Sequence, residues 1–275
     1  MKQYHKEILK SNIRKGRLLK YMLREFKAVT TSLPSQKKWI FVLGCYNSGT
    51  TLLHKLLASS SEIASLPGEG QFLTNQFLVP SHVGLSRLWI KEMDKFYLEA
   101  SNTGPNASKI KKQWASYMNH PARNFYMEKS PTDIARIKWF EKHFDKPYFV
   151  GIVRNGFAVA EGIRRKASYP IDEAIMQWKK SNEIMFNDLE SVQNKIMISY
   201  EELTSDANGT MNKVFDFLSL PEVSYQESSE MDIHGVKSGI ENMNHLSFNN
   251  ISEEDIAVIE KHAGDLLTKL KYSRD

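Results

Sequence analysis

The stretch that decides the fold runs from Lys38 to Leu53 and reads KWIFVLGCYNSGTTLL. Its apolar part, Trp39–Leu43, has the length and composition of a buried strand. Gly44–Gly49 is expected to form a loop, and the leucines within Thr50–Ser60 recur at helical spacing. The stretch therefore predicts a strand that leads into a helix N-terminus through a glycine-bounded loop.

This loop has the spacing of a phosphate-binding loop, because Gly44 and Gly49 stand five positions apart. In loops that bind nucleoside triphosphates, a lysine follows the second glycine and meets the β- and γ-phosphates, whereas Thr50 stands here. Main-chain N–H groups and the helix dipole still favour a phosphate, without a γ-phosphate or magnesium. The side chains expected to add donors are Asn47, Ser48, Thr50 and Thr51. A glycine–serine turn that only caps a helix is the alternative.

Further strands and helices alternate downstream. Tyr148–Val153 is strand-like, Arg154–Gly156 is a turn, Phe157–Lys166 has a helical pattern, and Lys195–Ser199 predicts a third strand. Such alternation favours a mainly parallel sheet with helices on both faces. We therefore expect a three-layer α/β fold with ligands at the carboxyl ends of the strands.

The rest of the chain holds fewer signals. Asn208–Leu218 and Ser252–Leu270 read as helices, and the second opens with a Ser-Glu-Glu-Asp capping sequence. Residues 72–127 are rich in aromatic side chains. These side chains could shape a binding pocket, although aromatics at irregular spacing are more typical of a core.

Several motifs, in their order along the chain, resemble the sulfotransferase family. Ser48–Leu53, after a strand, resembles that family's 5′-phosphosulfate loop. The motifs that follow are Glu128–Pro131, Tyr148–Gly156, Ser199–Leu203 and Phe217–Pro221. The resemblance covers roughly residues 38–272. It implies a P-loop-like fold, and we expect residues 36–275 to form a sulfotransferase domain.

The resemblance also implies a reaction. A sulfuryl group would pass from 3′-phosphoadenosine 5′-phosphosulfate (PAPS) to a hydroxyl or amine of a small polar acceptor, a carbohydrate or natural product, leaving 3′-phosphoadenosine 5′-phosphate (PAP). Pro67–Glu69 places the match nearest to bacterial members and to the tyrosylprotein and carbohydrate enzymes, in which the glutamate is the base. Glu69 is therefore the expected base. A surface or helix-capping carboxylate is the alternative for this residue.

The remaining roles come from the same resemblance. Lys129 would neutralise charge on the bridging oxygen of the donor, and Arg154 would bind the 3′-phosphate with its planar set of donors. Lys166 could share that phosphate, and Tyr200 could hydrogen-bond the nucleotide. The ordinary alternatives are a solvated loop lysine for Lys129, a solvated helix face for Lys166 and core packing for Tyr200.

Two positions depart from the family pattern. Many relatives have a basic residue where Asn47 stands, and a serine that binds the 3′-phosphate where Gly162 stands. These departures leave open a non-catalytic nucleotide-binding homologue. A small-molecule kinase with a degenerate phosphate loop is the other alternative, and Thr50 in place of lysine counts against it.

Positive charge is concentrated at the N-terminus. Residues 1–28 hold nine basic and two acidic residues, a net charge of +7, so the chain total of +5 leaves −2 for the remainder. A nucleic-acid partner is therefore not indicated. Within residues 1–35 we expect a basic amphipathic helix whose apolar stripe packs on its own domain. Docking through residues 1–28 on an anionic membrane or a partner is the alternative. The apolar stripe consists of Leu18, Leu19, Met22, Leu23 and Phe26.

Other features bear on location and cofactors. No apolar run approaches the roughly 18 residues of a membrane span, and no secretory signal is recognised. The single cysteine, Cys45, agrees with a reducing compartment, so a cytoplasmic location is expected. No cysteine and histidine spacing indicates a metal site.

Overall fold

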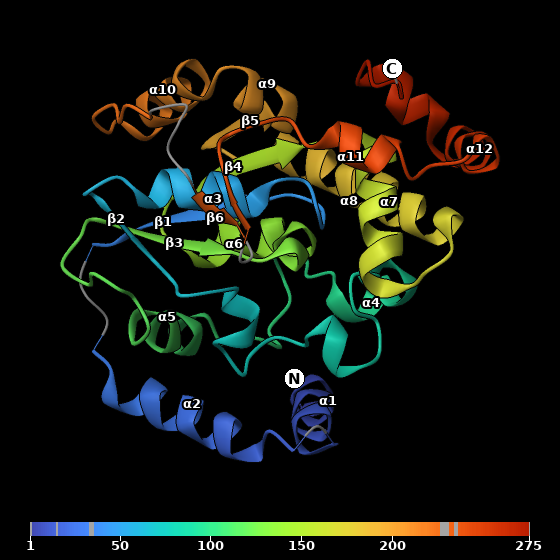
Figure 1. Cartoon of the computed structure of the whole chain (residues 1–275). Coiled ribbons are helices and arrows are strands. Elements are labelled where there is room, and N and C mark those ends of the chain that lie inside the picture. Colours follow the sequence, from blue (N-terminus) through green and yellow to red (C-terminus); the bar gives the residue numbers. More distant parts are fainter. Residues whose placement is uncertain (1, 15, 33–35, 226–230, 234–235, 275) are drawn as a thin grey trace.

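A five-stranded parallel sheet forms the centre of the computed structural model, which describes residues 2–14, 16–32, 36–225, 231–233 and 236–274 (Figure 1). Every neighbouring pair of its strands is parallel. The three predicted strands are confirmed, and with them the mainly parallel sheet. In sheet order the strands are β2 (Ile63–Ser65), β3 (Phe125–Lys129), β1 (Lys38–Leu43), β4 (Tyr148–Val153) and β5 (Lys195–Ser199).

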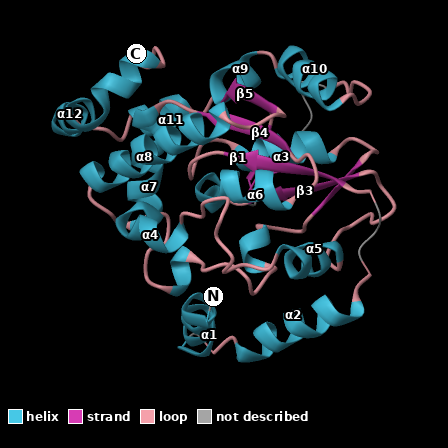
Figure 2. Cartoon of the chain, turned by 180° about the vertical axis from the view of Figure 1, so that it is seen from behind, coloured by secondary structure: helices cyan, strands magenta, loops and turns pink. Residues whose placement is uncertain are grey.

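The central strand, β1, is buried on both faces because its side chains alternate between two hydrophobic cores. Trp39, Phe41 and Leu43 belong to one core, and Ile40 and Val42 belong to the other. Helices therefore cover both faces of the sheet (Figure 2), which confirms the three-layer α/β fold. The first core is covered by α5 (Ala107–Ala115), α6 (Ile137–His143), α7 (Gly156–Ala167), α8 (Ile171–Glu190) and α12 (Glu253–Lys269); the second is covered by α3 (Thr50–Ala58), α9 (Tyr200–Ser205) and α10 (Ala207–Leu218).

The four helices predicted within the domain are confirmed as α3, α7, α10 and α12, with ends that differ by at most two residues. The capping sequence works as expected, since Ser252 Oγ accepts from the Asp255 N–H at 3.1 Å while Asp255 Oδ2 accepts from the Ser252 N–H at 3.0 Å. Apart from the three predicted strands, the other elements of the domain were not predicted. The shorter ones are η1 (Gly70–Phe72), η2 (Pro80–His82), η3 (Trp89–Glu92), α4 (Met93–Phe96), η4 (Pro131–Arg136), β6 (Met231–Ile233), β7 (Val236–Ser238) and α11 (Asn244–Phe248).

The aromatic segment 72–127 is mainly core. Phe77, Trp89 and Trp114 are buried and belong to the first core. Phe72 is 39% exposed instead, and it lines the cleft described below. The core interpretation therefore holds for most of the segment, and one aromatic side chain borders the cleft.

The N-terminal segment forms two helices, α1 (Lys2–Arg14) and α2 (Leu18–Thr30), and α2 packs against α5. The expectation that its apolar stripe packs on the domain is wrong. Arg24 and Ala28 are the buried residues of α2, whereas all five stripe residues are exposed. The predicted boundary at residues 35 and 36 adjoins residues 33–35, which lie outside the described residues.

Candidate active site

The loop between β1 and α3 exposes the N-terminus of α3. Gly49 has a φ of 89°, and a Cβ at this position would lie 2.6 Å from the Tyr200 ring, so only glycine fits there. The helix begins at Thr50, and the Leu53 N–H donates to the Gly49 carbonyl at 3.1 Å. The first N–H groups of a helix lack intrahelical partners, which makes this turn suitable for an anion.

A cleft of about 660 Å³ opens in front of the loop. It lies at the carboxyl ends of the strands, where parallel sheets bind ligands. Ser48 is the one predicted site residue outside the lining, because its side chain is buried and its N–H donates to the Cys45 carbonyl at 3.2 Å. The predicted site residues that line the cleft are Asn47, Gly49, Thr50, Thr51, Glu69, Lys129, Arg154, Lys166 and Tyr200.

Two of the lining residues, Glu69 and Lys129, form an ion pair. Lys129 Nζ, at the end of β3, lies 3.8 Å from Glu69 Oε1 and 3.5 Å from Thr51 Oγ1 on α3. The Lys129 and Glu69 side chains are only 11% and 26% exposed. Burial lowers the pKa of Lys129, and the neighbouring Glu69 carboxylate opposes this shift. The expected base and the expected cation therefore meet beside the phosphate loop.

A chain of hydrogen bonds, which is buried beyond Gln71, orients Glu69. Its Oε2 accepts from Gln71 Nε2 at 2.6 Å, and Gln71 Oε1 accepts from Thr132 Oγ1 at 2.9 Å. Arg136 Nη1 donates to Thr132 Oγ1 at 3.0 Å and is 3.0 Å from Asp133 Oδ1. Gln71 was not predicted as a site residue. Its place two positions after Glu69 is the only sequence signal for it.

Arg154 directly follows β4 and contacts three segments around the cleft: the phosphate loop, α11 and α9. Its Nη1 donates to the Asn47 carbonyl at 2.9 Å, and its Nε donates to Asn244 Oδ1 at 2.7 Å. The guanidinium lies over the Tyr200 ring, 4.1 Å from its centroid. Burial lowers the pKa of Arg154, with Tyr200 and Glu201 acting in the opposite direction. An arginine is thus held directly beside the phosphate loop.

Residues 40–225 match the sequence model of the sulfotransferase family. The chain belongs to this family. Solved structures agree in fold: STF9 from Mycobacterium avium has 12% identity and a TM-score of 0.59, with 98% of this chain and 85% of that chain covered. STF1 from Mycobacterium tuberculosis H37Rv has 14% identity and a TM-score of 0.52, with 90% and 81% covered. The sulfotransferase domain of the curacin biosynthetic pathway has 22% identity and a TM-score of 0.51, with 86% and 98% covered. No curated protein sequence matches the chain.

The two departures of this sulfotransferase from the family pattern lie next to each other. A Cβ at Gly162 would lie 3.1 Å from Cγ and Nδ2 of Asn47, so the glycine leaves room for the asparagine. Arg87 then reaches Asn47 from a distant loop, with Nη1 donating to Asn47 Oδ1 at 3.2 Å. Its guanidinium also lies 5.6 Å from the Tyr46 ring centroid. Sequence reasoning missed Arg87, because nothing in the sequence links it to the phosphate loop.

The cleft of the sulfotransferase suits an anionic ligand. Asn47 Nδ2 and Ser48 Oγ are buried and lack a hydrogen-bond partner within the described residues. Burial lowers the pKa of Lys166, with Arg87 and Arg165 acting in the same direction. Cys45 is no nucleophile, since burial raises the pKa of its thiol to about 12. The cations of the lining are Arg87, Lys129, Arg154, Arg165 and Lys166, against the carboxylates of Glu69 and Glu241.

Two features are absent from the part of the sulfotransferase that the structure describes. Within it, no group of three or more histidine, cysteine, aspartate and glutamate side chains is placed to hold a metal ion. None of the helices described is both long and apolar enough to pass through a bilayer.

Proposed function

We propose that this sulfotransferase transfers the sulfuryl group of PAPS to a hydroxyl or amine of a small polar acceptor and releases PAP. One observation carries the proposal: a carboxylate and an ammonium group, Glu69 and Lys129, lie 3.8 Å apart in the cleft that the phosphate loop borders. A base and a cation beside an anion-binding helix N-terminus are what sulfuryl transfer requires.

The donor nucleotide would be held at both of its ends. The N-terminal N–H groups of α3 and the hydroxyls of Thr50 and Thr51 would bind the 5′-phosphosulfate. Arg154 and Lys166 would bind the 3′-phosphate, with Tyr200 beside them. Asn47 lines the cleft, and its unpartnered Nδ2 supports a ligand that accepts hydrogen bonds at this loop.

In the chemical step, Glu69 takes the proton of the acceptor hydroxyl or amine. The acceptor atom forms a bond to sulfur, and the bond between sulfur and the 5′-phosphate oxygen breaks. That oxygen keeps the electron pair and leaves as part of PAP. Lys129 neutralises the charge that grows on it. Gln71 orients Glu69 through its 2.6 Å hydrogen bond.

Arg87 supplies the charge that Asn47 lacks. Its guanidinium bonds to the Asn47 side chain and lines the same cleft, so a cation stands close to where related enzymes carry one in the loop itself. The presence of the Arg87 guanidinium at this place favours a catalytic protein over a non-catalytic homologue. A carbohydrate or natural product is the proposed acceptor class, and the cytoplasm, where a single thiol stays reduced, is the proposed location.

Glu69→Gln tests the assignment. We expect turnover with PAPS to fall about 10²–10⁴-fold because the base is lost. The dissociation constant for PAP should stay within about twofold, because the amide keeps the shape of the side chain. Acceptor classes are screened with PAPS by mass spectrometry for a sulfated product, and calorimetry measures PAP binding.

Glu241→Gln is the matched control, since Glu241 is the other carboxylate that lines the cleft. This variant should keep wild-type turnover. Full activity in Glu69→Gln would rule out Glu69 as the base. Turnover of ATP with magnesium, together with none of PAPS, would replace the proposal with a kinase.

A further inference from the structure

Helix α2 shows its apolar face to solvent. Leu19, Phe26 and Val29 are 72%, 64% and 80% exposed, and Leu18, Met22 and Leu23 share their face. At 100° per residue these six side chains span less than half of the helix circumference, so they form one continuous surface. Ile13 of α1 is exposed as well. We call these seven residues the apolar ridge.

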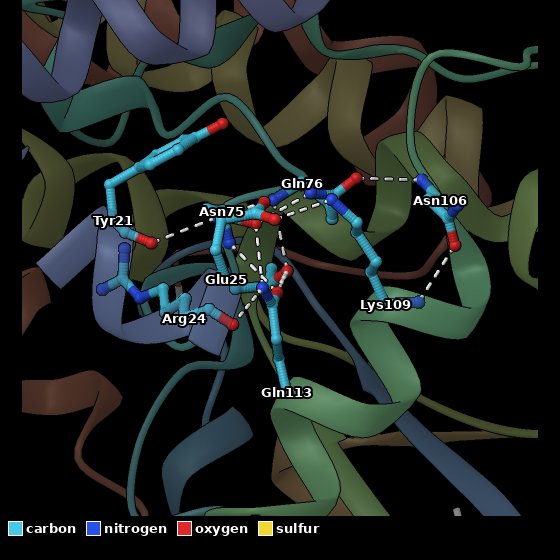
Figure 3. A network of polar contacts seen from close by, with 9 residues as sticks. Tyr21, Arg24, Glu25, Asn75, Gln76, Asn106, Lys109 and Gln113 are labelled. Carbon is cyan, nitrogen blue, oxygen red and sulfur yellow. Dashed lines mark hydrogen bonds and ion pairs between the residues drawn. The ribbon is translucent and has the colours of Figure 1, made fainter. Parts of the chain in front are cut away.

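Polar contacts fix this orientation from the other side of the helix (Figure 3). Gln113 Nε2 donates to the Arg24 carbonyl at 2.8 Å, and Asn75 Nδ2 donates to the Tyr21 carbonyl at 3.3 Å and to Glu25 Oε1 at 2.9 Å. Lys109 Nζ donates to Glu25 Oε2 at 2.7 Å. The polar side of α2 is therefore bonded to the domain, and turning the ridge inward would break these bonds.

The charges around the ridge have one sign. Glu25 is the only acidic residue of α2, and its carboxylate is bonded inward to Asn75 and Lys109. Lys20 is exposed, Arg17 is half-buried just before the helix, and Lys27 lies over the Tyr117 ring at 3.3 Å. An exposed apolar helix face bordered by basic side chains is typical of helices that lie in the interface of an anionic membrane.

A second copy of the chain fits this surface less well. Two ridges packed together would bring two N-terminal segments of net charge +7 into contact, and like charges oppose such a dimer. Six of the seven ridge residues lie along one side of α2. Because α2 lies at the edge of the molecule (Figure 1), this surface is convex. A lipid surface can deform around a convex ridge and supplies the negative charge.

We propose that α2 docks this protein on the surface of an anionic membrane. The ridge enters the boundary between headgroups and acyl chains, and Lys20, together with Arg17 at the start of the helix, meets the anionic headgroups. Phe72 connects this surface to the cleft: with Arg17 and Leu23 it borders a hollow beside α2, and it also lines the cleft. Docking therefore places the cleft entrance close to the membrane.

Vesicle flotation of the full chain tests the proposal. Wild-type protein should bind vesicles with equal parts of phosphatidylglycerol and phosphatidylcholine, bind phosphatidylcholine vesicles far less, and dissociate with rising salt. The triple variant Leu19→Ser, Met22→Ser, Phe26→Ser should lose at least about a hundredfold in partition coefficient. Arg17→Gln with Lys20→Gln should lose about 25-fold, since each basic residue contributes about fivefold.

Met93→Ser is the matched control, because Met93 is an exposed apolar residue outside the ridge. It should bind vesicles like the wild type, and thermal unfolding should be unchanged in all variants because the substituted side chains are exposed or half-buried. The proposal is overturned if wild-type protein does not bind anionic vesicles, or if the triple variant still does. It is overturned in favour of a second copy if the wild type is a dimer that the triple variant dissociates. Binding to polyglutamate but not to vesicles, lost in the triple variant, would overturn it in favour of an acidic protein.

Discussion

At the scale of single residues, the site combines positions that are far apart in the sequence. Asn47 gives the phosphate loop a neutral side chain, and Gly162 leaves the space into which this side chain fits. Arg87, 40 positions from Asn47, brings a guanidinium to that side chain. The two positions at which we expected departures from the family pattern are thus adjacent in the fold, and a third residue brings a positive charge beside them.

Arg87→Gln should therefore lower kcat about 10–100-fold, because one charge-assisted contact contributes about 1.5–3 kcal/mol. The decrease should appear mainly in kcat if the guanidinium acts on charge that develops during transfer. Steady-state kinetics at saturating PAPS measure the effect. Lys91→Gln, which removes an exposed cation of a neighbouring segment, is the control and should leave kcat unchanged. An unchanged kcat in Arg87→Gln would contradict the role.

At the scale of elements, α3 carries both the anion-binding turn and a half-buried imidazole, that of His54. Burial, followed by Lys129 and Lys55, lowers the pKa of His54 to about 4. Its Nε2 is buried without a hydrogen-bond partner in the described part of the chain. A neutral histidine therefore lies in the helix that follows the phosphate loop, and protonation of this histidine would destabilise the folded chain.

The sign of the resulting pH dependence follows from linkage. The unfolded chain binds a proton at His54 below pH about 6.5, whereas the folded chain does so only near the lowered value, so stability falls as pH falls through this window. The loss should reach roughly 3 kcal/mol at pH 4. Urea unfolding between pH 7 and pH 4 measures it. His54→Gln should flatten this decrease, whereas His120→Gln, at an exposed histidine, should keep the wild-type decrease.

At the scale of the whole molecule, the cleft is assembled from segments spread along most of the chain. Its lining includes the loop after β1, the end of β3, the turn after β4, and residues of α9 and α11. A nucleotide bound between Arg154 and the phosphate loop would therefore contact elements on both sides of β1. Such a ligand stabilises the folded chain as a unit.

PAP at a hundred times its dissociation constant should raise the free energy of unfolding by about 2.7 kcal/mol. For a chain of this size the midpoint temperature should rise by about 5–10 °C. Differential scanning fluorimetry measures the shift. Arg154→Ala should lose most of it at the same PAP concentration, and an equal shift in this variant would place the nucleotide elsewhere.

Some elements were predictable because their signals are local. The apolar run of β1, the spacing of Gly44 and Gly49, and the cap at Ser252 each lie within a few residues. By contrast, β3 was missed because it ends in Glu128 and Lys129, whose charges do not indicate a buried strand. β2 was missed because three residues carry no recognisable pattern.

The sequence by itself determined three strands of the central sheet, four helices of the domain and the phosphate loop, because these signals depend on neighbours along the chain. Its resemblance to the sulfotransferase family supplied Glu69, Lys129 and Arg154 as candidates. Tertiary structure alone decided that Glu69 and Lys129 form a pair, that Arg87 reaches Asn47, and that the apolar side of α2 faces outward. Periodicity shows that a helix has two faces. Which of the two faces packs on the domain depends on the residues that the fold places beside the helix. For α2 these residues bond to the polar face; they are Asn75, Lys109 and Gln113, which lie far away in the sequence.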